Sequence, residues 1–246
     1  MVNDENVCQL VYNLTNEGGC IYFMRREKNA EFVLQTLRNT DWNLQNLIIW
    51  KKKTSAVPVK GKCSKQYQII AYATKGEKTK TFNRLRINPE IPVNYKFQRE
   101  NGIYVTDVWD NIRELTSGYF AGQEAIRLNG SGRFYKQQAL LVLLLRIILI
   151  STNVGDIVLD PFSGTGITSV AAKQIQRKSI AIELDPNNIK CIQNRLKCIS
   201  KADNIHKYYQ DYIYTEGLQN IWGNEIKIVS SLKQAVVQNL SLFNEI

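Results

Sequence analysis

The sequence predicts an α/β fold in which helices cover both faces of a Rossmann-like sheet. Residues 156–160 read as a short buried strand, followed by an abrupt glycine-containing turn and the start of a helix. A second strand, residues 179–183, comes next and carries a carboxylate at its far end. In open α/β sheets ligands bind outside the carboxyl ends of the strands, so Asp160 and Glu183 are expected to project toward one ligand.

The turn between these strands favours one class of ligand. Gly164 and Gly166 let the backbone turn tightly and approach a ligand without a Cβ in the way. A dinucleotide fingerprint needs a third glycine, where this chain has Ser169, and Asp160 would stand close to any pyrophosphate. S-adenosylmethionine has no phosphate; its ammonium and its two ribose hydroxyls suit acids at two strand ends. A loop that merely packs a helix on a strand would explain an isolated Gly-x-Gly, but the full Asp-Pro-Phe-Ser-Gly-Thr-Gly string favours a cofactor site.

Positive charge is concentrated in one segment of the chain. The net charge is +10, and residues 51–100 hold 13 Lys and Arg against 3 Asp and Glu, while the remainder holds 19 of each. Localised positive charge beside a neutral body is typical of a protein that binds a phosphate backbone, so double-stranded DNA is the predicted partner. The candidate DNA-binding residues are Lys51, Lys52, Lys53, Lys60, Lys62, Arg84 and Arg86.

Several other classes of protein are disfavoured. The five cysteines show no Cys-x-x-Cys spacing and His206 is the single histidine, so we expect no metal site and little room for a Ser-His or Cys-His nucleophile. An odd number of scattered thiols suits a reducing cytoplasm. The longest apolar run, residues 139–150, is too short to span a bilayer and contains Arg146. With no signal peptide apparent, we expect a cytoplasmic protein without a membrane partner.

The cofactor string also carries a family resemblance. Asp160-Pro-Phe-Ser-Gly-Thr-Gly-Ile-Thr168 and residues 180–183 resemble motifs I and II of the amino-methylating DNA methyltransferases, which modify adenine N6 or cytosine N4. In the group that places the catalytic half first, a motif ending His-Pro-Thr-Gln-Lys-Pro precedes the cofactor strand. Here its equivalent is residues 134–139, in which only Gln137 is retained. The resemblance implies an S-adenosylmethionine-dependent methyltransferase sheet whose cofactor-binding residues are Asp160, Pro161, Phe162, Ser163, Gly164, Gly166, Thr168, Glu183 and Gln137.

The resemblance runs from about residue 10 to residue 196 and implies four regions. Residues 1–74 are the N-terminal, catalytic-side half of the sheet, truncated. Residues 75–130 interleave basic and aromatic side chains and correspond to an inserted target-recognition region. Residues 131–200 are the S-adenosylmethionine-binding half. Residues 201–246 form a C-terminal extension to which the sequence assigns no role.

Apolar periodicity predicts the remaining elements. Strands are predicted at residues 46–50 and 67–73, and we expect them to pair as an antiparallel hairpin. Beyond residue 200, residues 208–214 could include a third cofactor-side strand and residues 232–242 a terminal helix. The other predicted elements are a strand at residues 20–24 and helices at residues 5–14, 30–39, 136–152 and 187–199.

One motif of the resembling family is missing. The amine of a flipped base is held by a loop written Asp, Asn or Ser, then Pro-Pro, then an aromatic residue. The five prolines stand at positions 58, 89, 92, 161 and 186, so none are adjacent. In this motif order the strand that carries the loop should precede the helix before Gly18, and only 17 residues lie upstream, so the strand would fall before Met1. No catalytic residue is therefore named.

Three functions follow from these observations. The first is a site-specific DNA methyltransferase of the kind found in restriction-modification systems, with adenine N6 favoured over cytosine N4 because adenine is the commoner acceptor in the resembling family. Its catalytic loop would come from a missing segment, a companion chain or a homodimer. The second is a catalytically inactive relic or subunit that binds S-adenosylmethionine, DNA or both. The third is a nicotinamide-dependent enzyme, against which the missing third glycine argues.

Overall fold

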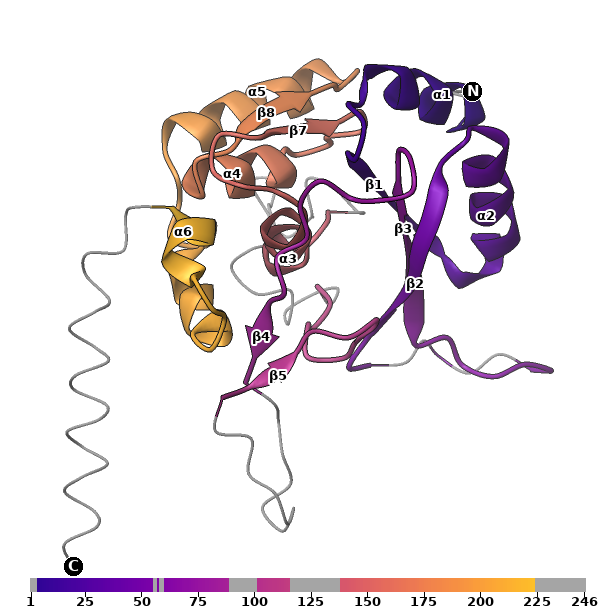
Figure 1. Cartoon of the computed structure of the whole chain (residues 1–246), viewed down its shortest axis with the longest axis horizontal. Helices are drawn as coiled ribbons and strands as arrows, with labels where there is room; N and C mark the ends of the chain where they lie inside the picture. Colours follow the sequence, from indigo (N-terminus) through magenta and orange to yellow (C-terminus); the bar gives the residue numbers. More distant parts are fainter. Residues whose placement is uncertain (1–3, 55–56, 58–59, 89–100, 116–137, 224–246) are drawn as a thin grey trace, which may run out of the picture.

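The N-terminal half forms a four-stranded mixed sheet flanked by two helices (Figure 1). The computed structural model describes residues 4–54, 57, 60–88, 101–115 and 138–223. The sheet order is β1-β3-β2-β6, with β3 antiparallel to both neighbours and β6 parallel to β2. The elements of this half are α1 (Asp4–Leu14), β1 (Cys20–Arg26), η1 (Glu27–Asn29), α2 (Ala30–Asn39), β2 (Asn43–Lys51), β3 (Tyr67–Thr74) and β6 (Val108–Trp109).

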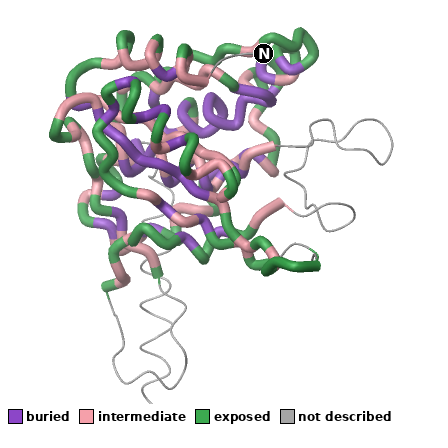
Figure 2. Tube along the Cα trace, turned by 90° about the vertical axis from the view of Figure 1, so that its right-hand side faces the viewer, coloured by how far each residue is buried: buried purple, intermediate pink, exposed green. Residues whose placement is uncertain are grey.

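The central strand β3 separates two apolar cores. Successive side chains of a strand point to opposite faces, so Ile69 and Ala71 pack toward α2 while Ile70 and Tyr72 pack toward the second half of the chain. All four are buried, and Ile70 and Ala71 have no exposed surface. Helices therefore cover both faces of this sheet, as predicted, and the hairpin predicted for β2 and β3 is confirmed. Figure 2 shows the buried residues gathered in the interior of the molecule.

The second half contains a two-stranded parallel sheet. β7 (Ile157–Asp160) pairs with β8 (Lys178–Ala181), and Asp160 stands opposite Ala181. The helices of this half are α3 (Leu141–Ser151), α4 (Ile167–Gln174) and α5 (Pro186–Lys197). α3 is the buried helix expected from the apolar run, and its residues join β2 and β3 in one core cluster. Among the described residues, no helix has the length and apolar character needed to cross a bilayer.

The segment after α5 corrects one prediction. Residues 208–214 were expected to include a third strand, but the chain forms a 3-10 helix, η3 (His206–Tyr212), and then α6 (Leu218–Trp222). The helical path buries Tyr212 beside Trp222 and also packs both Tyr208 and Tyr209 on the core, whereas a strand would point these two neighbouring tyrosines to opposite faces. The predicted helix at residues 232–242 lies outside the described residues.

Two internal contacts join residues 86–111 to this C-terminal segment. Its hairpin of β4 (Arg86–Ile87) and β5 (Ile103–Tyr104) is held by Thr215, whose Oγ1 accepts a hydrogen bond of 2.8 Å from the Arg86 backbone N–H. Arg146 of α3 is 1 % exposed, and its Nε donates to Tyr212 Oη at 3.1 Å while its Nη1 donates to Asn111 Oδ1 at 3.0 Å. The buried guanidinium therefore links the segment after β6 to η3.

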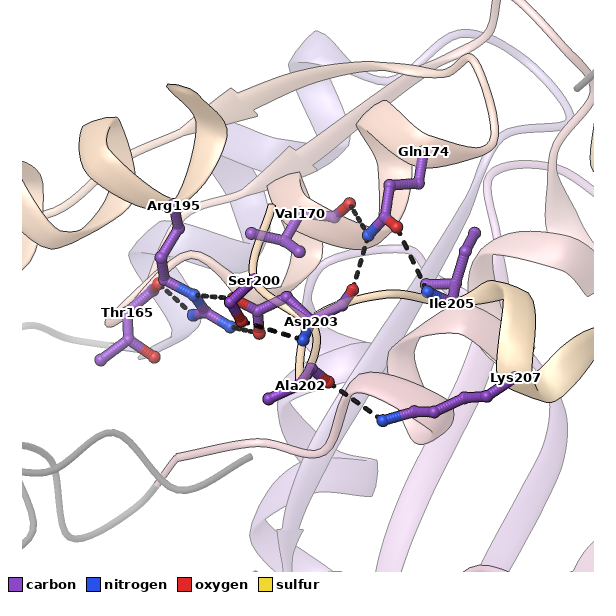
Figure 3. Close-up of polar contacts among 9 residues, drawn as sticks. All are labelled: Thr165, Val170, Gln174, Arg195, Ser200, Ala202, Asp203, Ile205 and Lys207. Carbon is purple, nitrogen blue, oxygen red and sulfur yellow. Dashed lines mark hydrogen bonds and ion pairs between the residues drawn. The ribbon is translucent and has the colours of Figure 1, made fainter. Parts of the chain in front are cut away.

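A buried ion pair anchors the end of α5 (Figure 3). Arg195 and Asp203 are 8 % and 5 % exposed, and two hydrogen bonds of 3.1 and 2.6 Å join guanidinium to carboxylate. A third guanidinium nitrogen of Arg195 donates to the Thr165 carbonyl at 2.6 Å. Gln174 extends the network, because its Nε2 donates to the Asp203 carbonyl at 2.8 Å. Residues after α5 are thereby fixed against α4 and the turn before it.

Substitution Asp203→Asn is expected to destabilise the protein strongly, because it leaves the Arg195 charge buried without its counterion. Breaking a buried pair costs about 3–5 kcal/mol, whereas loss of an exposed pair costs about 1 kcal/mol or less. The matched control is Lys65→Ala, which removes the more exposed Lys65–Glu27 pair. Urea unfolding followed by circular dichroism measures both, and equal losses for the two variants would contradict the assigned role.

Candidate functional site

The Asp160 carboxylate closes the end of β7. One of its oxygens accepts a hydrogen bond of 3.1 Å from the Phe162 backbone N–H, and the other accepts one of 2.5 Å from the Thr168 hydroxyl. Thr168 lies in the first turn of α4, so the carboxylate joins the strand end to the helix start. The oxygens are thereby fixed in position at the carboxyl end of the strand, as the sequence predicted.

The Glu183 carboxylate is held by backbone amides. Its Oε2 accepts from the Gly164 N–H at 2.8 Å, and its Oε1 accepts from the N–H groups of Leu184 and Asp185 at 3.0 and 2.9 Å. Burial raises the pKa of Glu183, but hydrogen bonds led by the one from Asp185 outweigh it and the pKa lies below its usual value. The carboxylate is therefore charged at neutral pH.

The two acids hold opposite ends of one turn. Asp160 binds the N–H of Phe162 and Glu183 binds the N–H of Gly164, while Ser163 between them donates its N–H and its hydroxyl to the Ile182 carbonyl, both at 3.0 Å. The strands are in register at this level, since the Ile182 N–H donates to the Asp160 carbonyl at 2.9 Å. The structure thus brings the two predicted carboxylates to the same sheet edge, on either side of an open turn.

A cavity of about 70 Å³ opens beside Asp160. Pockets that enclose a whole drug-sized ligand measure about 300–1,000 Å³, so this cavity fits only one end of such a molecule. Phe162 is one of the residues that line the cavity, and it is 57 % exposed to solvent. The remaining lining residues are Gln138, Ala139, Leu144, Ser163, Gly164, Thr165, Ile167 and Thr168.

The predicted contact at Gln137 lies outside the described residues. Its neighbour Gln138 lines the cavity, together with Ala139 and Leu144 of the following segment. Sequence reasoning did not name these three residues as part of the site. Their position in the sequence could have predicted this, because they follow Gln137 directly and stand at the start of the apolar helix α3.

The turn requires glycine at its second position. Gly166 has φ +77°, and a Cβ added there would lie 2.7 Å from Ile192 Cγ1. Ile192 belongs to α5, so the close approach packs that helix against the turn. The Thr165 carbonyl is held from the same side by Arg195, as Figure 3 shows. α5 therefore packs against the turn between β7 and α4 and stabilises it.

The predicted DNA-binding residues fall in two groups. Most of the lysines lie around the loop between β2 and β3, where Lys51, Lys53, Lys60 and Lys62 are exposed. Glu114 fixes the start of this loop, because its carboxylate accepts from the N–H groups of Lys53 and Thr54, both at 2.9 Å. Lys52 is half-buried, with its ammonium 5.7 Å from the centre of the Trp50 ring.

The two predicted arginines differ in their surroundings. Arg84 is exposed, whereas Arg86 is half-buried in the β4–β5 hairpin. The Arg86 guanidinium donates to the Asn101 carbonyl at 2.9 Å and to Tyr104 Oη at 3.0 Å, and it lies 4.3 Å from the centre of the Tyr104 ring. Arg86 therefore stabilises the hairpin, while Arg84 presents its charge to solvent.

The family of the chain follows from comparison with known proteins. Residues 4–194, more than half of the chain, match the DNA methylase family of N6 and N4 enzymes. The chain belongs to this family. The match includes α1 to β3, both strands of the candidate site and most of α5.

Curated members of the DNA methylase family share about three residues in ten with the chain. It is 31% identical over 192 residues to the type II methyltransferase M.BamHI of Bacillus amyloliquefaciens, which covers 73% of this chain and 42% of that protein. It is 29% identical over 208 residues to the DNA adenine methyltransferase YhdJ of Escherichia coli K12, covering 77% of this chain and 64% of the relative. The chain thus spans between two fifths and two thirds of the length of these relatives.

Solved structures share the fold of this chain. The crystal structure of an M1.HpyAVI–SAM complex superposes with a TM-score of 0.54 at 22% identity, over 79% of this chain and 83% of that one. The cytosine-N4-specific PvuII DNA methyltransferase superposes with a TM-score of 0.57 at 15% identity, over 82% and 73% of the two chains. The methyltransferase sheet expected from the sequence is confirmed.

Substitution Gly166→Ala is expected to destabilise the protein more than Gly155→Ala. Both glycines have positive φ, +77° and +88°, so each alanine adds about 1–2 kcal/mol of backbone strain. Only at Gly166 does the new methyl group meet a neighbour, Ile192, which adds about 1–3 kcal/mol of overpacking. Urea midpoints at unchanged slope measure the difference, and equal losses would show that α5 is not packed tightly on the turn.

Proposed function

We propose that this chain carries the cofactor-binding and DNA-binding parts of an S-adenosylmethionine-dependent DNA amino-methyltransferase. The observation that carries the proposal is the pair of carboxylates, Asp160 and Glu183, on either side of an open glycine turn in a member of the DNA methylase family. The acceptor is the exocyclic amine of a base, with adenine N6 favoured over cytosine N4. The adenine-specific relative in Escherichia coli supports that preference.

Each group of the cofactor has a partner in the site. The cavity beside Asp160 fits the methionine end, and the carboxylate there attracts its ammonium. Glu183 is charged, and three backbone N–H groups and the Asn188 side chain already bind its carboxylate, so a ribose hydroxyl would bind there in exchange for one of these hydrogen bonds. Phe162 lines the cavity and is exposed, so its ring offers a face for the adenine.

The chemical step needs only positioning. The amine nitrogen attacks the methyl carbon, the sulfonium sulfur keeps the electron pair of the broken bond and becomes a thioether, and the nitrogen then gives up a proton to solvent. Holding the amine in line with the methyl group supplies most of the rate in such a transfer. The sequence contains no Pro-Pro pair, so we assign the amine-holding loop to a polypeptide segment outside these 246 residues.

The absence of a Pro-Pro pair from the sequence also supports a second candidate function. A chain that lacks an amine-holding loop could bind S-adenosylmethionine and DNA as an inactive subunit or relic. One measurement distinguishes the two functions. Transfer of labelled methyl groups to DNA is assayed for the chain alone and for the chain mixed with a polypeptide that contains the amine-holding loop. Cofactor binding with no transfer under either condition would favour the inactive subunit.

Substitutions Asp160→Asn and Glu183→Gln are each expected to weaken S-adenosylmethionine binding by about 10- to 100-fold. A hydrogen bond to a charged group contributes about 1.5–3 kcal/mol. The control is Asp156→Asn, which makes the same change just before β7, at the opposite end of the strand. Isothermal titration calorimetry measures all three affinities. No heat of binding with the unaltered chain, or an equal loss in the control, would refute the cofactor assignment.

The double substitution Lys51→Ala and Lys53→Ala is expected to weaken DNA binding and its dependence on salt. The slope of log affinity against log salt concentration should fall by about 0.9 for each phosphate that the variant no longer neutralises. Lys190→Ala on α5 serves as the control for a lysine outside the basic segment. Fluorescence anisotropy with labelled duplex over a salt series measures the slopes. Identical slopes for the double variant and the control would place the DNA elsewhere.

A further inference from the structure

One carboxylate lies at the start of the lysine-rich loop between β2 and β3. Glu114 stands five residues after the end of β6, and its Oε2 accepts a hydrogen bond of 2.9 Å from the Lys53 N–H. Its Oε1 accepts one of 2.9 Å from the Thr54 N–H and another from the Thr54 hydroxyl. Three donors from two neighbouring residues therefore converge on one anionic group.

The Glu114 carboxylate is charged at neutral pH. Burial raises its pKa, but hydrogen bonds led by the one from the Thr54 hydroxyl outweigh this effect, and the pKa lies below its usual value. The side chains of Lys51 and Lys53, at the end of β2 and the start of the loop, are exposed. A negative charge beside them repels the DNA phosphates that the lysines attract. The acid therefore stabilises the loop in the free chain and opposes the binding of DNA there.

The start of the loop is also fixed by contacts that do not involve Glu114. The Lys52 N–H donates to the Gln66 carbonyl at 2.7 Å, and Gln66 Nε2 donates to the Lys52 carbonyl at 3.2 Å. Lys51, the residue before, pairs with Tyr67 in the β2–β3 ladder. The next two N–H groups of the loop follow directly on this ladder, so they keep their place when the carboxylate leaves.

The segment that carries Glu114 is likewise held by other contacts. Trp50 Nε1 donates to the Ile112 carbonyl at 2.9 Å, and the Ile49 N–H donates to the Asp107 carbonyl at 2.7 Å. Ile112 itself is 2 % exposed. Loss of the Glu114 contact therefore detaches neither side, and it opens three hydrogen-bond donors on a preformed surface.

These three donors suit a phosphate of the DNA backbone. In protein–DNA complexes phosphate oxygens accept hydrogen bonds from backbone N–H groups and from Ser and Thr hydroxyls, besides Lys and Arg. Successive backbone N–H groups in a turn also form a concave site for anions. The Glu114 carboxylate stands in for such an anion, since it too offers two oxygens and a negative charge. Lys53 and Thr54 are exposed, so the site lies at the surface, beside charges that attract DNA.

We infer that the N–H groups of Lys53 and Thr54, together with the Thr54 hydroxyl, form a binding site for one phosphate of the DNA backbone, and that Glu114 occupies this site in the free chain. The phosphate displaces the carboxylate, and the lysines beside the site neutralise its charge. The inference rests on the proposed function for the identity of the ligand, because a free phosphate or sulfate ion has the same chemistry. The site itself depends only on the three donors and on the anion that they already hold.

Substitution Glu114→Ala tests the site, because it removes the competing carboxylate and leaves the donors. We expect the variant to bind a labelled duplex about threefold to tenfold more tightly than the unaltered chain, since the phosphate no longer has to displace a hydrogen-bonded group. Glu77→Ala is the matched control, because it removes the same charge at an exposed position of the basic segment. Its gain should be about twofold or less, because salt screens a charge outside the site. Fluorescence anisotropy at one salt concentration measures all affinities.

Substitution Thr54→Val separates a hydrogen-bonded site from a general change in charge. In the Glu114→Ala background it removes the hydroxyl donor and should cancel most of the gain. In the otherwise unaltered chain it weakens the hold on carboxylate and phosphate alike, so the two substitutions are not additive. An affinity of Glu114→Ala at or below that of the unaltered chain would show that the carboxylate only positions the loop, and would overturn the inference. An equal gain in Glu77→Ala, or a gain that survives Thr54→Val, would overturn it too.

Sodium sulfate probes the site in the absence of DNA. An anion that binds only the folded chain raises the midpoint of thermal unfolding. Sulfate should therefore raise the midpoint of Glu114→Ala more than that of the unaltered chain, in which the carboxylate fills the site. Sodium chloride at equal ionic strength is the control for screening. Equal rises in the two proteins would refute the anion site itself. A larger rise in the variant, in a chain that binds no duplex at any salt concentration, would support the anion site and refute the DNA-binding part of the proposed function.

Discussion

The site depends on one set of backbone hydrogen bonds, those that tie the ends of β7 and β8 to the turn between Phe162 and Gly164. Because Asp160 and Glu183 accept hydrogen bonds from N–H groups of the turn, and Ser163 of the turn donates to the Ile182 carbonyl, the strand ends and the turn hold one geometry. A mobile turn would leave two acids with no defined spacing. With the turn fixed, the two carboxylates keep one spacing at the sheet edge, which is what the proposed cofactor site requires.

Residues remote from the cavity maintain this geometry. Arg195 and Ile192 support the turn from α5, and Asp203 fixes Arg195 from a segment to which the sequence assigned no role. Arg146 has a similar role for the segment after β6, because it joins Asn111 to Tyr212 inside the core. The described residues after α5, up to residue 223, therefore pack as part of the folded body of the protein.

The sequence predicted those features that depend on local pattern. The strand, turn and helix around Asp160 followed from apolar runs and glycine spacing, and the β2–β3 hairpin followed from two apolar segments joined by a basic loop. Features that depend on contacts between residues far apart in the chain could not be predicted from the sequence. The path of residues 208–214 is decided by burial of Tyr212 and Trp222 against each other, and Gln138 enters the cavity through the packing of α3. Neither contact leaves a periodic signal.

The amide contacts of Glu183 bear on how tightly a ligand can be held. Immobilising a rotamer-rich side chain on binding costs about 0.5–1.5 kcal/mol. The Glu183 carboxylate already accepts hydrogen bonds from the N–H groups of Gly164, Leu184 and Asp185. Its side-chain entropy is therefore lost when the protein folds and not when a ligand binds. A carboxylate that is preorganised in this way loses no further side-chain entropy when a ligand binds to it.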